Sequence, residues 1–275
     1  MAIDKVVVFG GTGQVGSELK KLAGSEFIFF DSKQANFQER EKVRQVLLTL
    51  KPSVVVNLAG YTNVDLAELE RTKCFLVNFL AVEEVISCCE VLKSYLVHFS
   101  SDYVFDGERG NYDEHDIVSP LNFYGLTKAW SEKTCLLYEN SLVVRTSHIF
   151  GGRNSIVFRF AEKIRDRKKL IVLSGQKVNI TYAVDLAKFI LFAIRERLGG
   201  LINFANSGTV TWPSLVDQIE KYFYISTEKE LVSEFPRPAR RPQNSTLNLE
   251  KVSGMFNVRN WEIALDEFLS NNFSG

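Results

Sequence analysis

Hydrophobic residues along the chain gather in short continuous runs that alternate with longer amphipathic segments. The runs lie at 6–9, 27–30, 54–59, 95–100 and 142–147, with a further one at 201–205. Between the runs, apolar residues recur every three or four positions, which is the spacing of a helix with one buried face. Strands that are apolar on both faces are typical of parallel sheets covered by helices on both sides. The pattern therefore predicts an α/β fold with a doubly wound parallel sheet.

Local signals place the boundaries of several helices. Asn36 precedes an amphipathic segment as a candidate N-cap, Pro120 leads into another, and Thr211 is a candidate cap for the segment that ends at Tyr224. The apolar pattern from Leu66 to Val91 predicts one long helix. We expect a nucleotide-binding domain at 1–150 plus about 183–206, and a smaller C-terminal α/β lobe at about 151–182 and 207–275.

A glycine-rich turn follows the first strand. Gly10, Gly13 and Gly16 stand three residues apart between Phe9 and a helical pattern. In a dinucleotide-binding turn the first glycine permits the bend, the second lets the backbone approach a pyrophosphate, and the third brings helix and strand together. The motif predicts a Rossmann-type fold, with the anion bound at the N-terminus of the helix.

Asp31 closes the second strand about 20 residues after this turn, where a carboxylate can accept hydrogen bonds from the adenosine ribose. Its charge would repel a 2′-phosphate, so the sequence slightly favours NADH over NADPH. Lys33 leaves NADPH open. For Asn36 we favour helix capping over a contact with adenine.

Polar residues at the carboxyl ends of the strands indicate the ligand site, because ligands of such sheets bind there. Ser101 follows the fourth strand, and Tyr124 and Lys128 stand four residues apart, on one face of a helix. An adjacent ammonium favours the phenolate, so we expect Lys128 to bring the pKa of Tyr124 down toward neutrality.

Taken in order, these motifs resemble the extended short-chain dehydrogenase/reductases, and more narrowly the dTDP-4-dehydrorhamnose reductases. The resemblance runs nearly end to end. It is based on five blocks of sequence, at 10–19, 61–68, 100–107, 120–128 and 237–248. The last block is the most telling, because generic reductases lack it.

The resemblance implies reduction of the C4 ketone of a dTDP-4-keto-6-deoxyhexose, namely dTDP-4-dehydro-L-rhamnose, by NADH or NADPH. Tyr124 would give the proton, Ser101 would bind the carbonyl oxygen and Lys128 would support Tyr124 and the ribose. The implied cofactor contacts are Gly10, Gly13, Gln14, Val15, Asp31, Asn36, Phe37, Ala59, Gly60, Tyr61, Asn78 and Lys128. The implied substrate contacts are Thr62, Val64, Asp102, Tyr103, His148 and Arg241, with Arg241 at the diphosphate.

Three positions depart from the family pattern. Ser101 replaces a threonine and keeps the hydroxyl, and 178–181 replaces a Gly-x-Pro-Thr turn, so the loop geometry should differ. His148 stands where the family has a tryptophan, which exchanges a stacking plate for a smaller, titratable ring. The changes at 178–181 and at His148 lie on the substrate side, so the resemblance defines the type of reaction better than it defines the sugar.

The composition limits the kinds of binding partner that we expect for this chain. The net charge is zero, with 33 basic and 33 acidic residues, so we expect a small molecule and not nucleic acid. No apolar run approaches the roughly 18 residues of a membrane helix, and no signal-peptide pattern opens the chain. Four cysteines without metal-ligand spacing predict buried reduced thiols, no metal site and a cytoplasmic protein.

Two alternatives to the reductase stay open. One is another nucleotide-sugar 4-ketoreductase or epimerase. The other is a non-catalytic NAD(P)-binding regulatory subunit, which the β subunit of methionine adenosyltransferase exemplifies within the same subfamily. The absence of an extension before the first strand and the presence of Ser101, Tyr124 and Lys128 together favour the enzyme. A homodimer is compatible with the sequence.

Overall fold

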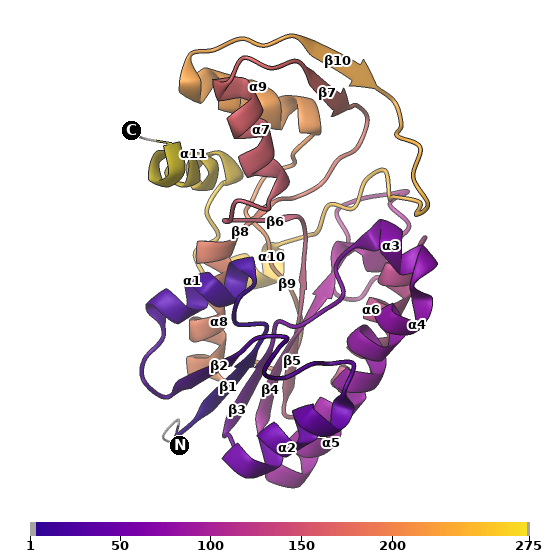
Figure 1. The fold of residues 1–275 in the computed structure, drawn as a ribbon, viewed down its shortest axis with the longest axis vertical. Coiled ribbons are helices and arrows are strands. Elements are labelled where there is room, and N and C mark those ends of the chain that lie inside the picture. The colour runs from indigo at the N-terminus through magenta and orange to yellow at the C-terminus, as the bar shows by residue number, and fades with distance from the viewer. Residues whose placement is uncertain (1–3, 274–275) are drawn as a thin grey trace.

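The computed structural model describes residues 4–273. Residues 1–3, part of the N-terminal segment in which we find no signal peptide, lie outside the described residues. A six-stranded parallel sheet in the order β2-β1-β3-β4-β5-β9 forms the centre of the larger part (Figure 1). Its strands are β1 (Val6–Phe9), β2 (Phe27–Phe30), β3 (Val54–Asn57), β4 (Tyr95–Ser101), β5 (Ser141–Thr146) and β9 (Gly200–Asn203).

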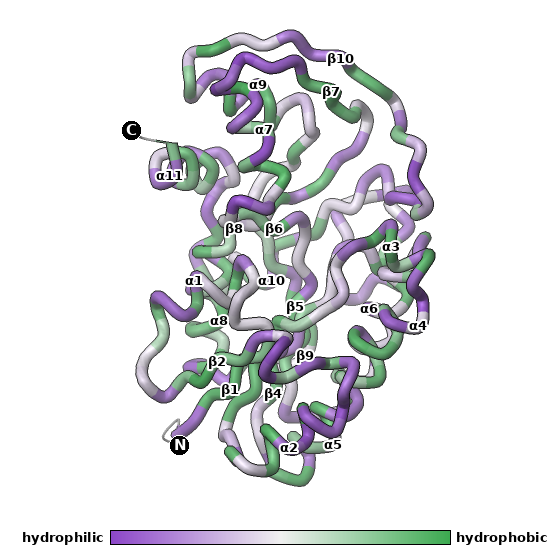
Figure 2. The backbone as a smooth tube through the Cα atoms, viewed as in Figure 1, coloured by the Kyte–Doolittle hydropathy of each residue, from purple (hydrophilic) through white to green (hydrophobic). Residues whose placement is uncertain are grey.

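Helices cover both faces of this sheet. One face carries the packed pair α1 and α8, and the other carries α2, α5 and α6 (Figure 1). Successive side chains of β1 point to opposite faces of the sheet. Val6 and Val8 therefore pack in the hydrophobic core on one face, and Val7 and Phe9 pack in the core on the other. The hydrophobic colour along the central strands in Figure 2 reflects this double burial. The helices are α1 (Gln14–Leu22), α2 (Arg40–Leu50), α5 (Ala81–Leu92), α6 (Phe123–Leu136) and α8 (Ala183–Glu196).

The remaining elements gather above the carboxyl ends of the strands (Figure 1). Two small parallel pairs, β6 with β8 and β7 with β10, combine there with three helices around a separate hydrophobic core. The elements are β6 (Ile149–Phe150), α7 (Ile156–Arg165), β7 (Leu170–Leu173), β8 (Thr181–Tyr182), α9 (Trp212–Phe223), β10 (Lys229–Val232) and α11 (Trp261–Phe273). The short helix α10 (Glu250–Ser253) packs instead on β9, and its Val252 belongs to a core of the large sheet.

The α/β fold with a doubly wound parallel sheet is confirmed, and so is the Thr211 cap. The Thr211 side chain accepts the N–H of Ser214, and the Ser214 hydroxyl accepts the N–H of Thr211, which makes a capping box. Within residues 4–273 no helix is long and apolar enough to cross a membrane. All four cysteines are buried free thiols, as expected.

Two predicted helix starts were wrong. The helix expected after Asn36 begins at Arg40, because Asn36 instead accepts the N–H of Gln38 in a local turn. Similarly, α6 begins at Phe123, where Asn122 accepts the N–H of Gly125, and not at Pro120.

The long helix expected from Leu66 to Val91 is interrupted. It consists of α3 (Val64–Leu69), α4 (Arg71–Phe75), the π-helical turn η1 (Leu76–Leu80) and α5. A π turn inserts an extra residue without changing the apolar character of the segment, so the sequence pattern does not reveal it.

Candidate active site at the carboxyl edge of the sheet

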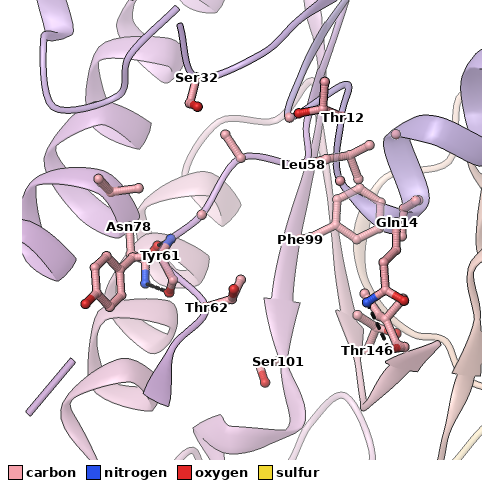
Figure 3. Close-up of a pocket in the computed structure, with 18 of the residues that line it drawn as sticks. Thr12, Gln14, Ser32, Leu58, Tyr61, Thr62, Asn78, Phe99, Ser101 and Thr146 are labelled. Atoms are coloured by element: carbon pink, nitrogen blue, oxygen red, sulfur yellow. Dashed lines mark hydrogen bonds between the residues drawn. The ribbon is translucent and has the colours of Figure 1, made fainter. Parts of the chain in front are cut away.

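A pocket of about 850 Å³ opens at the carboxyl ends of β1, β3, β4 and β5. In Figure 3, Thr12 and Gln14 lie on one side of the strand ends, and Tyr61, Thr62 and Asn78 lie on the other. Strands β2 and β3 lie on opposite sides of β1 in the sheet, so the strand order reverses at β1. Sheets of α/β proteins bind nucleotides at such a switch point. The pocket is thus where the sequence motifs place it.

The glycine turn forms one end of the pocket. Gly10 has φ of +81°, and a Cβ atom at Gly16 would lie 2.4 Å from the carbonyl oxygen of Gly10. Gly13 faces more open space, since its nearest neighbour for a Cβ atom is that same oxygen at 3.3 Å. The first glycine therefore makes the bend, the third brings α1 against the strand, and the second leaves its backbone open to a ligand. These residues fit a dinucleotide pyrophosphate.

The residues predicted to contact the cofactor lie around this end of the pocket. Its wall includes Gly10, Gly13, Gln14, Val15, Asp31, Asn36, Phe37, Ala59, Gly60, Tyr61, Asn78 and Lys128. Gln14 also has a second role that the sequence did not suggest. Its amide donates to the carbonyl oxygen of Ile149 and accepts the N–H of Gly152, and so ties the glycine turn to the loop after β6.

Asp31 and Asn78 are both held by the backbone. One oxygen of Asp31 accepts the N–H groups of Lys33 and Gln34. Asn78 lies in the π turn η1, where its side chain accepts the N–H of Tyr61 at 2.7 Å and donates to the carbonyl oxygen of the same residue at 3.1 Å. The π turn thus fixes the loop after β3, which forms one wall of the pocket.

Ser101, Tyr124 and Lys128 meet in the same pocket. Ser101 ends β4, and the other two share one face of α6. Burial raises the pKa of Tyr124 to about 12, and its side-chain hydrogen bond with Ser101 only partly offsets this rise. Burial lowers the pKa of Lys128 to about 8.

The expected lowering of the Tyr124 pKa was therefore wrong. Desolvation raises the pKa of the phenol and lowers that of the ammonium, and Lys128 is not among the groups that shift the pKa of Tyr124. The phenol stays protonated at neutral pH, which is the form that a proton donor needs.

Asp102 follows Ser101 in the short 3₁₀ turn η2 (Asp102–Val104) and is buried. Its carboxylate receives three hydroxyl groups, from Ser101 at 3.1 Å, Ser147 at 2.9 Å and Ser245 at 2.6 Å. Burial raises the pKa of Asp102, while these hydrogen bonds and the nearby His148 oppose the rise. Asp102 lies in the pocket wall, as expected for a substrate contact, but its oxygens already bind the protein. Sequence reasoning missed Ser147 and Ser245, which carry no motif of their own.

The other residues expected at the substrate have mixed positions. Thr62, Val64, Tyr103 and His148 line the pocket. Arg241 is not among the residues that line this pocket. Its guanidinium lies 5.8 Å from the centre of the Tyr103 ring and pairs with Asp65 at 2.9 Å. Arg241 and Tyr103 are nevertheless in contact, so the C-terminal block reaches the wall of the pocket.

A glycine turn, a parallel sheet and a Ser-Tyr-Lys set in one pocket define a dinucleotide-dependent oxidoreductase of the Rossmann type. Comparison with known proteins narrows this class. The family model described as RmlD substrate binding domain matches residues 4–273. The chain belongs to this family.

Several curated relatives are named dTDP-4-dehydrorhamnose reductase, and one of 30% identity is the Spore coat polysaccharide biosynthesis protein SpsK of Bacillus subtilis (strain 168). The dTDP-4-dehydrorhamnose reductase of Salmonella typhimurium (strain LT2) is 33% identical, and that of Escherichia coli (strain K12) is 31% identical, each over 98% of both chains. A crystal structure of dTDP-4-dehydrorhamnose reductase from Bacillus anthracis, in complex with NADP, superposes with a TM-score of 0.93 at 28% identity and covers 98% of this chain and 100% of that one. A Thermus thermophilus UDP-glucose 4-epimerase complex with NAD shares only the fold, at 18% identity.

Proposed function

We propose that this protein reduces the C4 ketone of a dTDP-4-keto-6-deoxyhexose with NADH or NADPH, and that dTDP-4-dehydro-L-rhamnose becomes dTDP-L-rhamnose. The observation that carries the proposal is the position of Ser101, Tyr124 and Lys128 in one pocket with the glycine turn. The names of the relatives supply the substrate, and the bound NADP of the Bacillus anthracis protein supports the cofactor class.

In this proposal Tyr124 donates its proton to the alkoxide that forms at C4. The raised pKa of Tyr124 keeps that proton in place until the oxygen becomes basic. Ser101 hydrogen-bonds the carbonyl oxygen. Because its single O–H donates to Asp102 in this structure, the hydroxyl exchanges that carboxylate for the ketone when the substrate binds. The cofactor, when bound, supplies the hydride. Lys128 supports Tyr124 and binds the ribose.

We assign cofactor binding to residues 1–150 plus about 183–206, and substrate binding to about 151–182 and 207–275. The core around α7, α9 and α11 is separate from the two cores of the large sheet, which supports this division for those helices, whereas Val252 of α10 packs in a core of the large sheet. Asp31 at the ribose end of the pocket favours NADH. The buried free thiols are consistent with the cytoplasm.

Of the substrate contacts, we assign the sugar to Thr62, Val64 and Tyr103 and the diphosphate to Arg241. Because Arg241 is paired with Asp65, it would exchange that carboxylate for the diphosphate when the substrate binds.

The test is the loss of NADH or NADPH absorbance when the purified protein receives enzymatically generated dTDP-4-keto-L-rhamnose. We expect Tyr124→Phe to lower kcat by roughly 10²–10⁴-fold and to keep cofactor binding, because it removes general acid catalysis alone. Tyr224→Phe is the matched control, since Tyr224 is 96% exposed. Cofactor binding without turnover by the natural chain would overturn the reductase and favour the regulatory subunit.

A further inference from the structure

His148 lies between β5 and β6, in the wall of the pocket next to Thr146 and Ser147. It has a φ of +20°, which is unusual for a residue with a side chain. Strained backbone of this kind concentrates at ligand sites, where the surrounding structure imposes it. The position of His148 in the pocket wall and its positive φ are both typical of a residue at a ligand site.

Two aromatic rings fix its orientation. Trp212 packs edge-on against the imidazole at 4.9 Å between ring centres, and Tyr103 does so at 5.9 Å. Trp212 is itself held by a hydrogen bond of 3.0 Å from its Nε1 to Gln176. The imidazole is therefore placed by groups that cannot satisfy its nitrogens.

A fully buried histidine in the sheet provides the contrast. His98, in the middle of β4, has one ring nitrogen 3.2 Å from Asn57 and the other 3.2 Å from Ser131. His148 is half-buried, and no hydrogen bond joins its ring nitrogens to another group among residues 4–273. His98 is a satisfied structural residue, whereas His148 presents a free donor and a free acceptor to the pocket.

Burial keeps the imidazole of His148 neutral, and the charged groups around it shift its pKa in both directions. They come from η2 (Asp102) and from the C-terminal block (Arg237 and Arg241), and Tyr103 is the other titratable neighbour. Burial and the two arginines lower the pKa of His148, and Asp102 opposes them. No hydrogen bond joins Asp102 to the ring among residues 4–273, and the carboxylate instead receives the hydroxyl groups of Ser101, Ser147 and Ser245. A neutral imidazole can both donate and accept.

We propose that His148 is a specificity-determining residue that hydrogen-bonds a hydroxyl group of the sugar ring beside the reacting ketone. Tyr103 contacts Tyr124 on one side, at 6.1 Å between ring centres, and His148 on the other, so one hexose can reach both. The inference rests on the proposed function and adds a substrate requirement to it. This site selects a hydroxylated 4-ketohexose and rejects the analogue that lacks the recognised hydroxyl, because that analogue leaves the imidazole unpaired.

The experiment combines variants of the protein with variants of the substrate. kcat/KM is measured for dTDP-4-keto-L-rhamnose and for its 2-deoxy and 3-deoxy analogues with the natural chain, His148→Phe and His148→Gln. We expect the natural chain to lose about tenfold on one deoxy analogue, which is the scale of one hydrogen bond to a neutral group. His148→Phe should not distinguish that analogue from the full substrate, and His148→Gln should regain part of the discrimination.

A binding measurement separates this inference from the proposed function. Calorimetry with dTDP-L-rhamnose and its deoxy analogues, in the Tyr124→Phe background, reports recognition of the hydroxyl without turnover. Equal discrimination with and without the imidazole, in both measurements, would overturn the role of His148 while leaving the reductase intact. If the natural chain turns over no substrate and binds none of the sugars, the proposed function fails first. Circular dichroism checks that each variant is folded.

Discussion

Lys128 illustrates how burial sets the chemistry of a single side chain. Its pKa is lowered to about 8, whereas that of Tyr124 is raised to about 12. As the pH rises through 8, the lysine loses its proton while the tyrosine keeps its own. We therefore expect kcat/KM to fall on the alkaline side with an apparent pKa near 8.

The pH profile of Lys128→Arg provides the control, because a guanidinium stays charged at this pH. If that variant retains measurable activity, its alkaline limb should move to higher pH. A natural enzyme whose activity stays flat up to pH 10, or an unchanged limb in Lys128→Arg, would contradict the assignment.

Residue types and spacing were enough to predict which side chains meet at the site. Gly10, Ser101, Tyr124 and Lys128 each stand in a motif whose chemistry requires that residue, and the pocket contains all four. The three serine hydroxyl groups that donate to Asp102 show what residue types and spacing do not predict. Ser245 is 143 positions away along the chain, and a lone serine in a loop carries no signal of its partner.

The π turn η1 is an element whose irregularity has a structural use. It presents Asn78 to the backbone of Tyr61, and the same amide donates to Thr127 on α6 at 3.1 Å. Asn78→Ala leaves the partly buried N–H and carbonyl of Tyr61 without these partners, which costs up to about 1–3 kcal/mol for each such group. We expect a lower free energy of unfolding, measured in urea, and weaker cofactor binding, because the loop after β3 lines the pocket.

Asn140→Ala is a suitable control for this variant. Asn140 donates to the carbonyl oxygen of Lys93 at the surface and also hydrogen-bonds Tyr138, far from the pocket wall, so its loss should change stability little and cofactor affinity not at all. Equal cofactor affinity in Asn78→Ala and the natural chain would show that the π turn does not position the loop.

Amphipathic periodicity predicted the existence and order of the elements better than their ends. The N-cap at Thr211 was found because a hydroxyl, a proline and a helical pattern coincide there. Asn36 also belongs to a residue type that favours N-caps, but its side chain makes a turn instead, and the helix begins at Arg40. A capping side chain can satisfy a turn as well as a helix, so the local sequence does not distinguish them.

At the scale of the whole molecule, segments distant in sequence join the sheet to the C-terminal elements. The segment 244–248 illustrates this, because its backbone bonds Gly107 and Tyr112 in the loop after β4 while Ser245 reaches Asp102. The sequence predicted that two such parts exist, from composition and element order. It did not predict the contacts between them, since each contact depends on the folded positions of both.

Arg259 makes the most extensive ionic link between the two parts. Its guanidinium binds both oxygens of Asp185 on α8, at 2.7 and 3.1 Å, and also binds Glu267 on α11. α8 packs on the large sheet, whereas α11 belongs to the separate C-terminal core. Asp185 is 8% exposed in this pair, so Arg259→Met leaves a nearly buried carboxylate without its cation.

We expect Arg259→Met to lower the free energy of unfolding by about 3 kcal/mol, at the lower end of the range for broken buried pairs because Arg259 keeps some contact with solvent. Arg195→Met is the matched control, since the Arg195–Glu196 pair is exposed and should contribute no more than about 1 kcal/mol. Urea unfolding followed by tryptophan fluorescence measures both variants. Trp212 and Trp261 report on the C-terminal core and Trp130 on α6, so a loss confined to one part would give two transitions. Equal unfolding free energies for the two variants would contradict a structural role for the Arg259 link.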